Sequence, residues 1–463
     1  MLKKSISIAM AFVGVVVGAG FASGQEAIQF FAAFGGYGIA GAVIAAILLS
    51  ITGMIVLKFG SFFLANEHTA VFNKVTYPVL ARLLDVGIML TLFSVGFVMF
   101  AGAGANLEQQ FGLPMWAGAL IMLVLVIATG FLDVDKVSQV IGAFTPFIII
   151  FLALAMFFAL RDAPADLSTL QPYSAQVETA LPNWWVSFAN YVGFTIIVGA
   201  SMCIVIGGAH YDTKAAGWGG LIGGVIYGVL LVGLVVSLWV SLPIVGKEDM
   251  PTLALVDHVN PMLGNIMAVV IYGMIYNTAI GMFYSMSRRI TANKPENFLK
   301  VYIAMSLIGF VLSFVGFKTL VSFLYPLLGY LGILLIVVLL AAYARGRSRI
   351  DAEIERRDTM RSLVARKLHP GKVFTKKHAR KLKKVVAESP AEEDSLRETI
   401  VLDVAQELVE DESVDFTEEQ AEEIREQLAD ETSKEVVVEI AEGDLPSKST
   451  EPPAGSHRPL AKH

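Results

Sequence analysis

The chain of 463 residues has little cysteine and little charge. Its one cysteine, Cys203, lies in an apolar stretch, so the chain forms neither an internal disulfide nor a cysteine-based metal cluster. Only 16% of the residues are charged, 55% are hydrophobic, and the mean hydropathy is +0.64. This composition predicts an integral membrane protein and excludes secreted, nuclear and soluble-enzyme chains.

Motifs for catalysis are missing as well. No glycine-rich loop ending in Lys-Ser or Lys-Thr is present, which argues against an ATP-driven pump. His68, His210 and His258 stand alone in loops, and we interpret them as solvated side chains. We therefore expect no enzyme, no cofactor, and no metal beyond a coupling ion, Na⁺ or H⁺.

The charges that are present are unevenly distributed. Residues 1–344 carry 14 Lys+Arg and 14 Asp+Glu, whereas the remaining 119 residues carry 21 and 27. This division predicts a membrane domain over 1–344 and a charged tail. The tail divides into a basic segment (345–384), an acidic and partly helical segment (385–445), and an end expected to be disordered (446–463).

Ten apolar stretches in the membrane domain are long enough to cross a bilayer, which takes about 20 residues. They are residues 5–33, 38–63, 84–106, 115–132, 139–160, 185–207, 217–241, 263–288, 298–316 and 321–343. With a cytoplasmic N-terminus, eleven basic residues, Lys136 among them, fall inside and only three outside. The positive-inside rule therefore predicts a multi-pass protein with both termini in the cytoplasm.

The two halves of the membrane domain resemble each other. An offset of 181 residues places Val17-Gly18-Ala19 on Val198-Gly199-Ala200 and aligns the span centres. This predicts a five-plus-five repeat of residues 1–160 and 185–344. Because five is odd, the second half enters the membrane from the opposite side, and such inverted halves can exchange inward-open and outward-open shapes.

The first span contains four glycines within eleven residues, from Gly14 to Gly24. Glycine weakens a helix, and unwound backbone at membrane depth survives only where it lines a cavity or binds something. We therefore expect a broken helix here and a second break in the sixth span around Gly199. The alternative in both spans is close packing of small residues.

Glu26 follows this glycine run and is the only carboxylate well inside an apolar span. A buried acid there is a candidate to hold a substrate ammonium, carry a coupling proton, or form a gate with Lys318. The alternative is a wet vestibule residue without a coupling role. In the eighth span, the oxygens of Asn277 and Thr278 suit a hard cation, with interhelical hydrogen bonding as the alternative.

The stretch Gly18-Ala19-Gly20-Phe21-Ala22-Ser23-Gly24-Gln25-Glu26 resembles the YkvI-type bacterial membrane proteins. Ten spans in inverted halves with broken helices 1 and 6 further resemble the amino acid–polyamine–cation superfamily, the LeuT fold. The resemblance covers about residues 1–345 and implies an all-α membrane transporter in a bacterial plasma membrane. It implies substrate at the two breaks and sodium between the first break and span 8.

The candidate residues follow from the breaks, from their neighbours and from this resemblance. Those expected to bind substrate are Gly18, Ala19, Gly20, Phe21, Ser23, Glu26, Ser94, Phe97, Thr195, Gly199, Ala200 and Ser201. Those that the resemblance assigns to a cation are the carbonyls of Gly14 and Val17, with Asn277, Thr278 or Gly281. The sodium symporters have an asparagine where this chain has Phe21, and Glu26 has no equivalent acid in them, so proton coupling stays open.

The sequence thus predicts a secondary active transporter of a small organic solute, with an amino acid as the expected substrate. The alternative is a non-transporting amino-acid sensor of the same fold that signals through its tail. We expect the bilayer as a partner, anionic lipids at the basic segment, and no nucleic acid. The sequence does not indicate an oligomeric state.

Overall fold

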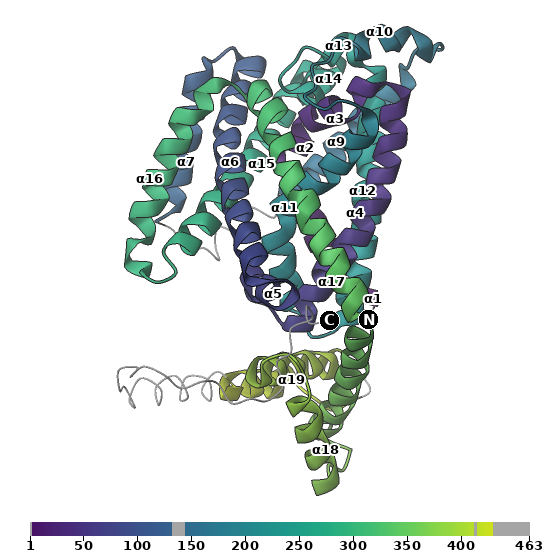
Figure 1. Cartoon of the computed structure of the whole chain (residues 1–463), viewed down its shortest axis with the longest axis vertical. Helices are drawn as coiled ribbons and strands as arrows, with labels where there is room; N and C mark the ends of the chain where they lie inside the picture. The colour runs from purple at the N-terminus through teal and green to yellow at the C-terminus, as the bar shows by residue number, and fades with distance from the viewer. Residues whose placement is uncertain (1, 132–143, 412–413, 429–463) are drawn as a thin grey trace.

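The computed structural model describes residues 2–131, 144–411 and 414–428, and this part of the chain is helical without β-strands (Figure 1). The first half of the membrane domain contains α1 (Leu2–Val16), α2 (Ala19–Ser23), α3 (Gln25–Phe30), η1 (Ala32–Phe34), α4 (Gly36–Phe63), α5 (His68–Val75), α6 (Pro78–Phe111), α7 (Met115–Thr129) and α9 (Phe144–Arg161). The loop that follows carries η2 (Leu167–Leu170) and α10 (Gln171–Ser174).

The second half contains α11 (Trp184–Gly208), α12 (Thr213–Val240), α13 (Leu242–Val245), α14 (Pro251–Val259), α15 (Pro261–Ile290), η3 (Pro295–Asn297), α16 (Phe298–Leu312), η4 (Ser313–Val315) and α17 (Phe317–Leu368). The tail adds α18 (Lys376–Ala387), α19 (Glu393–Glu410) and a helical stretch over 418–428.

Seven of these described segments are long and apolar enough to cross a membrane, and two shorter apolar helices lie in α7 and α9. Each predicted span falls on helical residues. The start of the fifth span, and with it Lys136, lies outside the described residues, as does the end of the chain from residue 429. Ten crossings in an inverted repeat therefore remain a prediction. In support of a repeat, α4 and α12 have 28 residues each and α7 and α16 have 15 each.

The membrane helices pack in two groups. In one group α1, α4, α11 and α12 pack together, and in the other α6 packs with α7, α15 and α16. Helix α17 contacts both α11 and α6 and lies between the groups (Figure 1). Glycines allow the first group to pack backbone to backbone: a Cβ on Gly220 of α12 would lie 2.6 Å from the Gly53 carbonyl oxygen of α4.

The predicted break in the sixth span is wrong, because α11 is one continuous helix of 25 residues. Its glycines serve packing instead. A Cβ on Gly193 would overlap the Gly329 carbonyl and lie 2.7 Å from the Ile333 nitrogen, both on α17. A glycine in a helix that tertiary contacts hold on both sides costs stability but does not unwind it.

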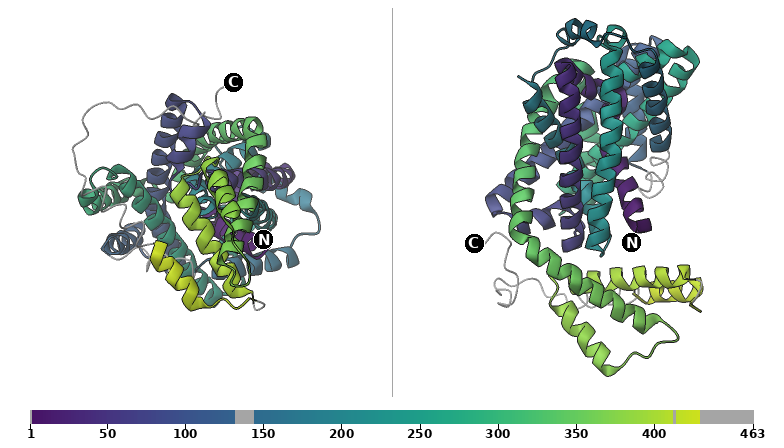
Figure 2. Two further views of the ribbon diagram at one scale, coloured as in Figure 1. Left: turned by 90° about the horizontal axis from the view of Figure 1, so that it is seen from below. Right: turned by 90° about the vertical axis from the view of Figure 1, so that its right-hand side faces the viewer.

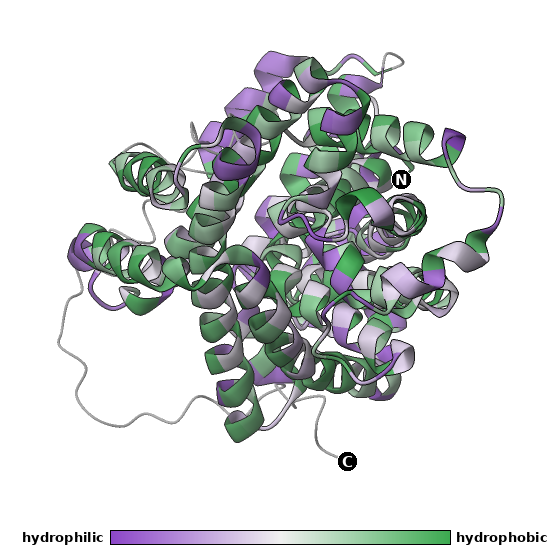
Figure 3. Ribbon diagram, turned by 90° about the horizontal axis from the view of Figure 1, so that it is seen from above, coloured by the Kyte–Doolittle hydropathy of each residue, from purple (hydrophilic) through white to green (hydrophobic). Residues whose placement is uncertain are grey.

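The membrane helices are largely apolar, as the green colour of their ribbons in Figure 3 shows, and many of their large apolar side chains are exposed. Exposed examples are Trp116, Val124, Val229, Val269 and Val311. An exposed apolar belt of this kind is stable only in lipid, so it supports the membrane assignment.

The tail is docked on the membrane domain rather than free. Helix α17 runs for 52 residues and leaves the membrane domain below α5, as Figures 1 and 2 show. Met360 and Val364 of α17 form an apolar cluster with α19 that also includes Leu64 and Tyr211 of the membrane domain. The acidic segment therefore packs against the ends of the membrane helices that lie nearest the tail.

Ion pairs join the acidic helix α19 to the start of α1. Lys4 Nζ lies 2.5 Å from Asp403 and 2.6 Å from Glu407, and Lys3 Nζ lies 2.8 Å from Glu410. Burial acts to raise the pKa of Glu407, but the hydrogen bonds from Lys4 and Arg361 outweigh it and hold that pKa below the ordinary value of a glutamate. Because the pKa of Glu407 is lowered when the tail is docked, its ion pairs stabilise docking at any pH above the pKa of the free carboxyl group. This contribution is lost as the pH falls through the lowered pKa of the docked state.

Candidate substrate and ion site

The first membrane helix is interrupted at Gly18, as the sequence predicts. Helix α1 ends at Val16 and α2 begins at Ala19. Between them, Gly18 N donates to the Val16 carbonyl at 2.9 Å rather than to Gly14, so the regular ladder stops. Within the described residues, the carbonyls of Gly14 and Val17 receive no backbone hydrogen bond. Two oxygens are thereby available to a cation.

A second interruption follows at Gly24, which the sequence analysis did not predict. Gly24 has a φ of 83°, a left-handed conformation that favours glycine. The Ser23 hydroxyl donates to the Gly20 carbonyl at 2.8 Å and accepts from Gln25 N at 3.2 Å. Ser23, predicted to bind substrate, thus stabilises this turn with its side chain. The Thr252 hydroxyl of α14 donates to the Ala22 carbonyl and ties the segment to its neighbour.

Glu26 is 7% exposed and its carboxylate covers Gly20. A Cβ on Gly20 would overlap a Glu26 carboxylate oxygen and lie 2.8 Å from Cδ. The Tyr191 hydroxyl of α11 lies near this carboxylate, and it lies 2.5 Å from the Tyr227 hydroxyl of α12. The acid thus faces the broken segment and two other helices of the first group.

Thr195, a predicted site residue, is buried and lies near both tyrosines of this cluster. The sequence analysis missed Tyr191 and Tyr227, which lie 36 residues apart on different helices. No local pattern could have paired them. Phe21 is 1% exposed and packs its ring 5.0 Å from that of Tyr227, so it forms the wall of the cluster.

The residues expected to bind a cation lie on α1 and α15. Asn277, Thr278 and Gly281 are half-buried on α15, which packs against α2. The Thr278 hydroxyl donates to the Met274 carbonyl of its own helix at 3.0 Å and still has its oxygen lone pairs to offer. A Cβ on Gly14 or on Gly281 would have no described atom within 4 Å. Both helices therefore have room beside these glycines.

Several predicted substrate residues lie elsewhere. Phe97 of α6 packs against Gly309 of α16 and forms an aromatic cluster with Phe93, so it belongs to the second helix group. Ser94 is buried on the same helix, and no contact places it at the break. In α11, Ala200 is buried, and a Cβ on Gly199 would lie 3.4 Å from Val15 beside the break.

Ser201 takes part in a different polar network, which also includes His68, Asp85 and Arg289. Its hydroxyl lies 3.0 Å from His68 Nδ1, and His68 Nε2 lies 3.0 Å from Asp85. Asp85 also accepts from Arg289 at 3.0 Å. The solvated interpretation of His68 is wrong, because this side chain is 4% exposed and bonded at both nitrogens.

Burial lowers the pKa of His68, although the neighbouring Asp85 opposes this effect. The ring is therefore neutral at pH 7. A carboxylate only accepts, so Nε2 carries the proton and donates to Asp85, and Nδ1 accepts from the Ser201 hydroxyl. The network joins α5, α6, α11 and α15 on the side where the tail docks.

Glu26 and Lys318 do not form an ion pair in the described structure. The Lys318 carbonyl instead accepts a hydrogen bond from Gln29 at 3.3 Å. Burial raises the pKa of Asp249, and the positive charge of the Lys318 ammonium partly opposes this. A gate between Glu26 and Lys318 remains a prediction for another conformation.

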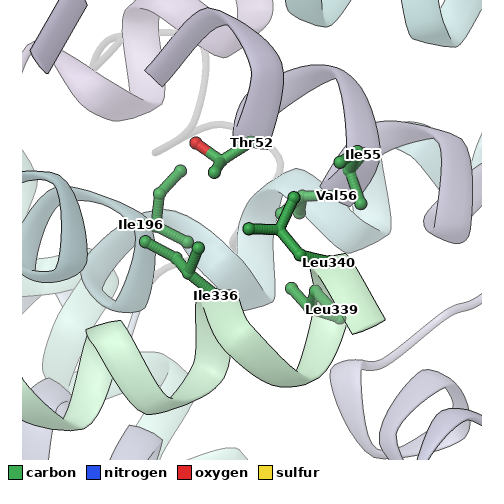
Figure 4. A pocket seen from close by; sticks show the side chains of 7 residues that line it. All are labelled: Thr52, Ile55, Val56, Ile196, Ile336, Leu339 and Leu340. Carbon is green, nitrogen blue, oxygen red and sulfur yellow. The ribbon is translucent and has the colours of Figure 1, made fainter. Parts of the chain in front are cut away.

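An apolar crevice between α4, α11 and α17 is not a ligand site (Figure 4). It has no room for a water molecule, and its one polar side chain, Thr52, donates to the Leu48 carbonyl of its own helix.

Two proteins of Bacillus subtilis (strain 168) are similar to this chain in sequence. The uncharacterized membrane protein YkvI is 25% identical over 342 residues, which cover 73% of this chain and 96% of YkvI. The uncharacterized protein YyaD is 28% identical over 334 residues, which cover 71% of this chain and 93% of YyaD. No family model matches the chain.

Two solved LeuT-fold transporters share the fold. MhsT in complex with L-phenylalanine has a TM-score of 0.55 at 13% identity, covering 86% of this chain and 96% of MhsT. Mhp1 in an inward-facing conformation has a TM-score of 0.51 at 13% identity, covering 90% of this chain and 93% of Mhp1. The chain is therefore similar in sequence to the YkvI-type membrane proteins, and it shares the fold of two LeuT-fold transporters.

Proposed function

We propose that this protein is a secondary active transporter of an amino acid-like solute that works by alternating access. The observation that carries the proposal is the interruption of the first helix at Gly18 with the buried Glu26 beside it. Irregular backbone at membrane depth is retained where it contacts a solute or an ion. The long, apolar helices around it provide the rigid frame that alternating access needs.

An amino acid fits the polar groups around the break. The carboxylate of Glu26 suits an ammonium group, and the hydroxyl of Thr195 is a donor for a carboxylate. MhsT, which shares the fold, is in complex with L-phenylalanine. At 13% identity this supports the fold and leaves the substrate as our proposal.

Sodium and protons are both candidates for the coupling ion. The free carbonyls of Gly14 and Val17, with Asn277 on α15, support a sodium site. The buried Glu26, with Tyr191 near it, supports a proton carrier. We place the protein in the bacterial plasma membrane with cytoplasmic termini.

Uptake into proteoliposomes tests this function. We expect the purified full chain to accumulate labelled amino acids from an equimolar mixture of the twenty common ones under an inward sodium gradient or an inward proton gradient. Empty liposomes and liposomes with both gradients collapsed are the controls. Equilibration without accumulation under either gradient would contradict active transport.

Glu26→Gln distinguishes the two coupling ions. The amide fills the same space over Gly20 but cannot exchange a proton. We expect it to remove the pH dependence of uptake and to lower uptake driven by a proton gradient at least about tenfold, the equivalent of 1.4 kcal/mol. Glu108→Gln, an exposed acid on α6, is the matched control. Unchanged pH dependence in Glu26→Gln would make this acid a structural partner of Tyr191.

The docked tail favours a second candidate function, that of a sensor. A polar cavity of about 490 Å³ lies between the membrane domain and α19, and Lys4, His210 and Asp403 are among its lining residues. A solute-driven movement of α1 would act on α19 through the ion pairs of Lys3 and Lys4. Ligand-dependent release of the tail without net uptake would favour the sensor over the transporter.

Anionic lipids are a proposed partner of the basic segment. Three exposed arginines lie on α17 immediately beyond the membrane domain: Arg345, Arg347 and Arg349. Figure 1 places the basic helix α18 at the opposite end of the tail, remote from the membrane helices. We therefore assign lipid contact to the first turns of the segment rather than to α18.

A further inference from the structure

Two carboxamide side chains are completely buried without any hydrogen-bond partner. Gln25 is 1% exposed and Asn106 is 0% exposed, and within the described structure neither the oxygen nor the nitrogen of either amide has a partner. In both, donor and acceptor are left open together; Asn190, by contrast, donates to the Pro326 carbonyl at 2.9 Å. Buried polar groups are almost always paired, so two such amides indicate that something else supplies the partner.

Gln25 faces the outer end of α17 and the start of α14. It precedes Gln29 by one turn of α3, and Gln29 donates to the Lys318 carbonyl of α17. Its other neighbour, Gly24, lies against α14: a Cβ on Gly24 would be 3.0 Å from Thr252 Cγ2.

Asn106 faces the same two elements from α6. It follows Gly102 by one turn, and a Cβ on Gly102 would lie 3.1 Å from the ring of Phe317, which begins α17. Three residues later Gln109 donates to the Met250 carbonyl and accepts from Met250 N, directly before α14. The two amides therefore lie on segments that both contact the starts of α14 and α17.

We propose that Gln25 and Asn106 form an outer polar subsite that binds the backbone ammonium and carboxylate of an amino acid on its way to the break at Gly18. Each amide offers one acceptor to the ammonium and two donors to the carboxylate. Asp249 lies just before α14 and Lys318 lies in the first turn of α17, and these two residues carry opposite charges and interact. The subsite rests on the proposed transport function and adds residues that neither the glycine run nor the resemblance assigns.

The energetics of an unpartnered amide make a sharp test. A buried amide without a partner has lost its hydrogen bonds to water and gained none in the protein. Replacing it with an apolar side chain of similar size therefore leaves the solute-free variant at least as stable as the solute-free wild type. If the amide binds solute, the same change weakens binding. Gain of stability together with loss of affinity separates a binding role from a structural one.

The experiment uses the full chain with Gln25→Leu, Asn106→Leu and, as a matched control, Ser287→Ala. Ser287 is 0% exposed, and its hydroxyl lacks a partner in the described structure, but it lies on α15 beside Arg288, away from the subsite. Unfolding temperature is measured in detergent with and without an equimolar mixture of the twenty common amino acids. The apparent KM for uptake of that labelled mixture is measured in proteoliposomes.

We expect all three variants to unfold at or above the wild-type temperature without the mixture. We expect Gln25→Leu and Asn106→Leu to lose the stabilisation by the mixture and to raise the apparent KM at least about tenfold, whereas Ser287→Ala keeps both. Wild-type KM and wild-type stabilisation in the two amide variants would overturn the subsite while leaving transport intact. A wild type that neither takes up the mixture nor is stabilised by it would overturn the proposed function and the amino-acid ligand together.

Discussion

Gly20→Leu is expected to lower amino-acid uptake by more than about 100-fold while the protein still inserts and folds. The Glu26 carboxylate covers Gly20 so closely that even a Cβ would overlap one of its oxygens. A leucine must therefore displace the acid from Tyr191 and fill the space beside the break. Overpacking of a tight site costs about 1 to 3 kcal/mol, which is the equivalent of roughly five- to 150-fold in an equilibrium constant. Leucine also obstructs the space beside the break.

The measurement is proteoliposome uptake, with size-exclusion behaviour in detergent as the check on folding. Gly20→Ala should show a smaller loss of about tenfold, because its single methyl requires only that Glu26 move. Gly36→Leu is the matched control, since a Cβ there has no described atom within 4 Å. Equal uptake by Gly20→Leu and wild type would exclude the break as the substrate site.

Arg357→Ala is expected to destabilise the docked tail by about 3 to 5 kcal/mol, the range for a buried ion pair that loses one partner. The Arg357 side chain is 3% exposed and pairs with the fully buried Glu353 at 2.8 Å. It also donates to the carbonyls of Ser61 and Phe62 at the end of α4 and of Tyr211 before α12. Its removal takes a donor from each of the three carbonyls and from the buried Glu353 carboxylate, which keeps Arg356 and the Ser389 hydroxyl as partners.

Limited proteolysis measures this effect, because a released tail exposes its basic residues to trypsin. Arg345→Ala is the control, since Arg345 is exposed and bonds only to the Ala341 carbonyl of its own helix in the described structure. The double variant Glu353→Ala with Arg357→Ala should recover part of the lost stability, because the change at Glu353 removes its buried carboxylate. Wild-type resistance of Arg357→Ala to trypsin would show that the apolar cluster alone holds the tail.

The membrane helices could be predicted from the sequence because lipid imposes a simple rule, a long apolar run. The break at Gly18 also followed from composition. The same reasoning failed for α11, which also contains four glycines, because the contacts of these glycines with other helices decide whether the helix unwinds. Gly193 faces Gly329 of α17, and contacts between residues so far apart in the chain leave no local signal.

The candidate site was predictable only in its local part. Glu26 stood out as an acid in an apolar span, but its neighbours Tyr191 and Tyr227 come from other helices. His68 was misinterpreted for the same reason, since its burial depends on Ser201 and Asp85. The charge blocks of the tail did not identify its partners, and only the fold selects Lys4 as a partner of Asp403.

Helix α17 acts as a lever arm that spans the whole molecule. Its 52 residues extend over about 78 Å at 1.5 Å per residue, from Lys318 at the outer end to the tail. Pro326 lies in its upper part, where it removes a backbone donor and makes the helix easier to bend. Arg357 lies about 46 Å further along, so a tilt of about 5° at Pro326 displaces its guanidinium by about 4 Å. A small tilt within the membrane domain is thus magnified into a displacement longer than a hydrogen bond where Arg357 bonds to Ser61, Phe62 and Tyr211.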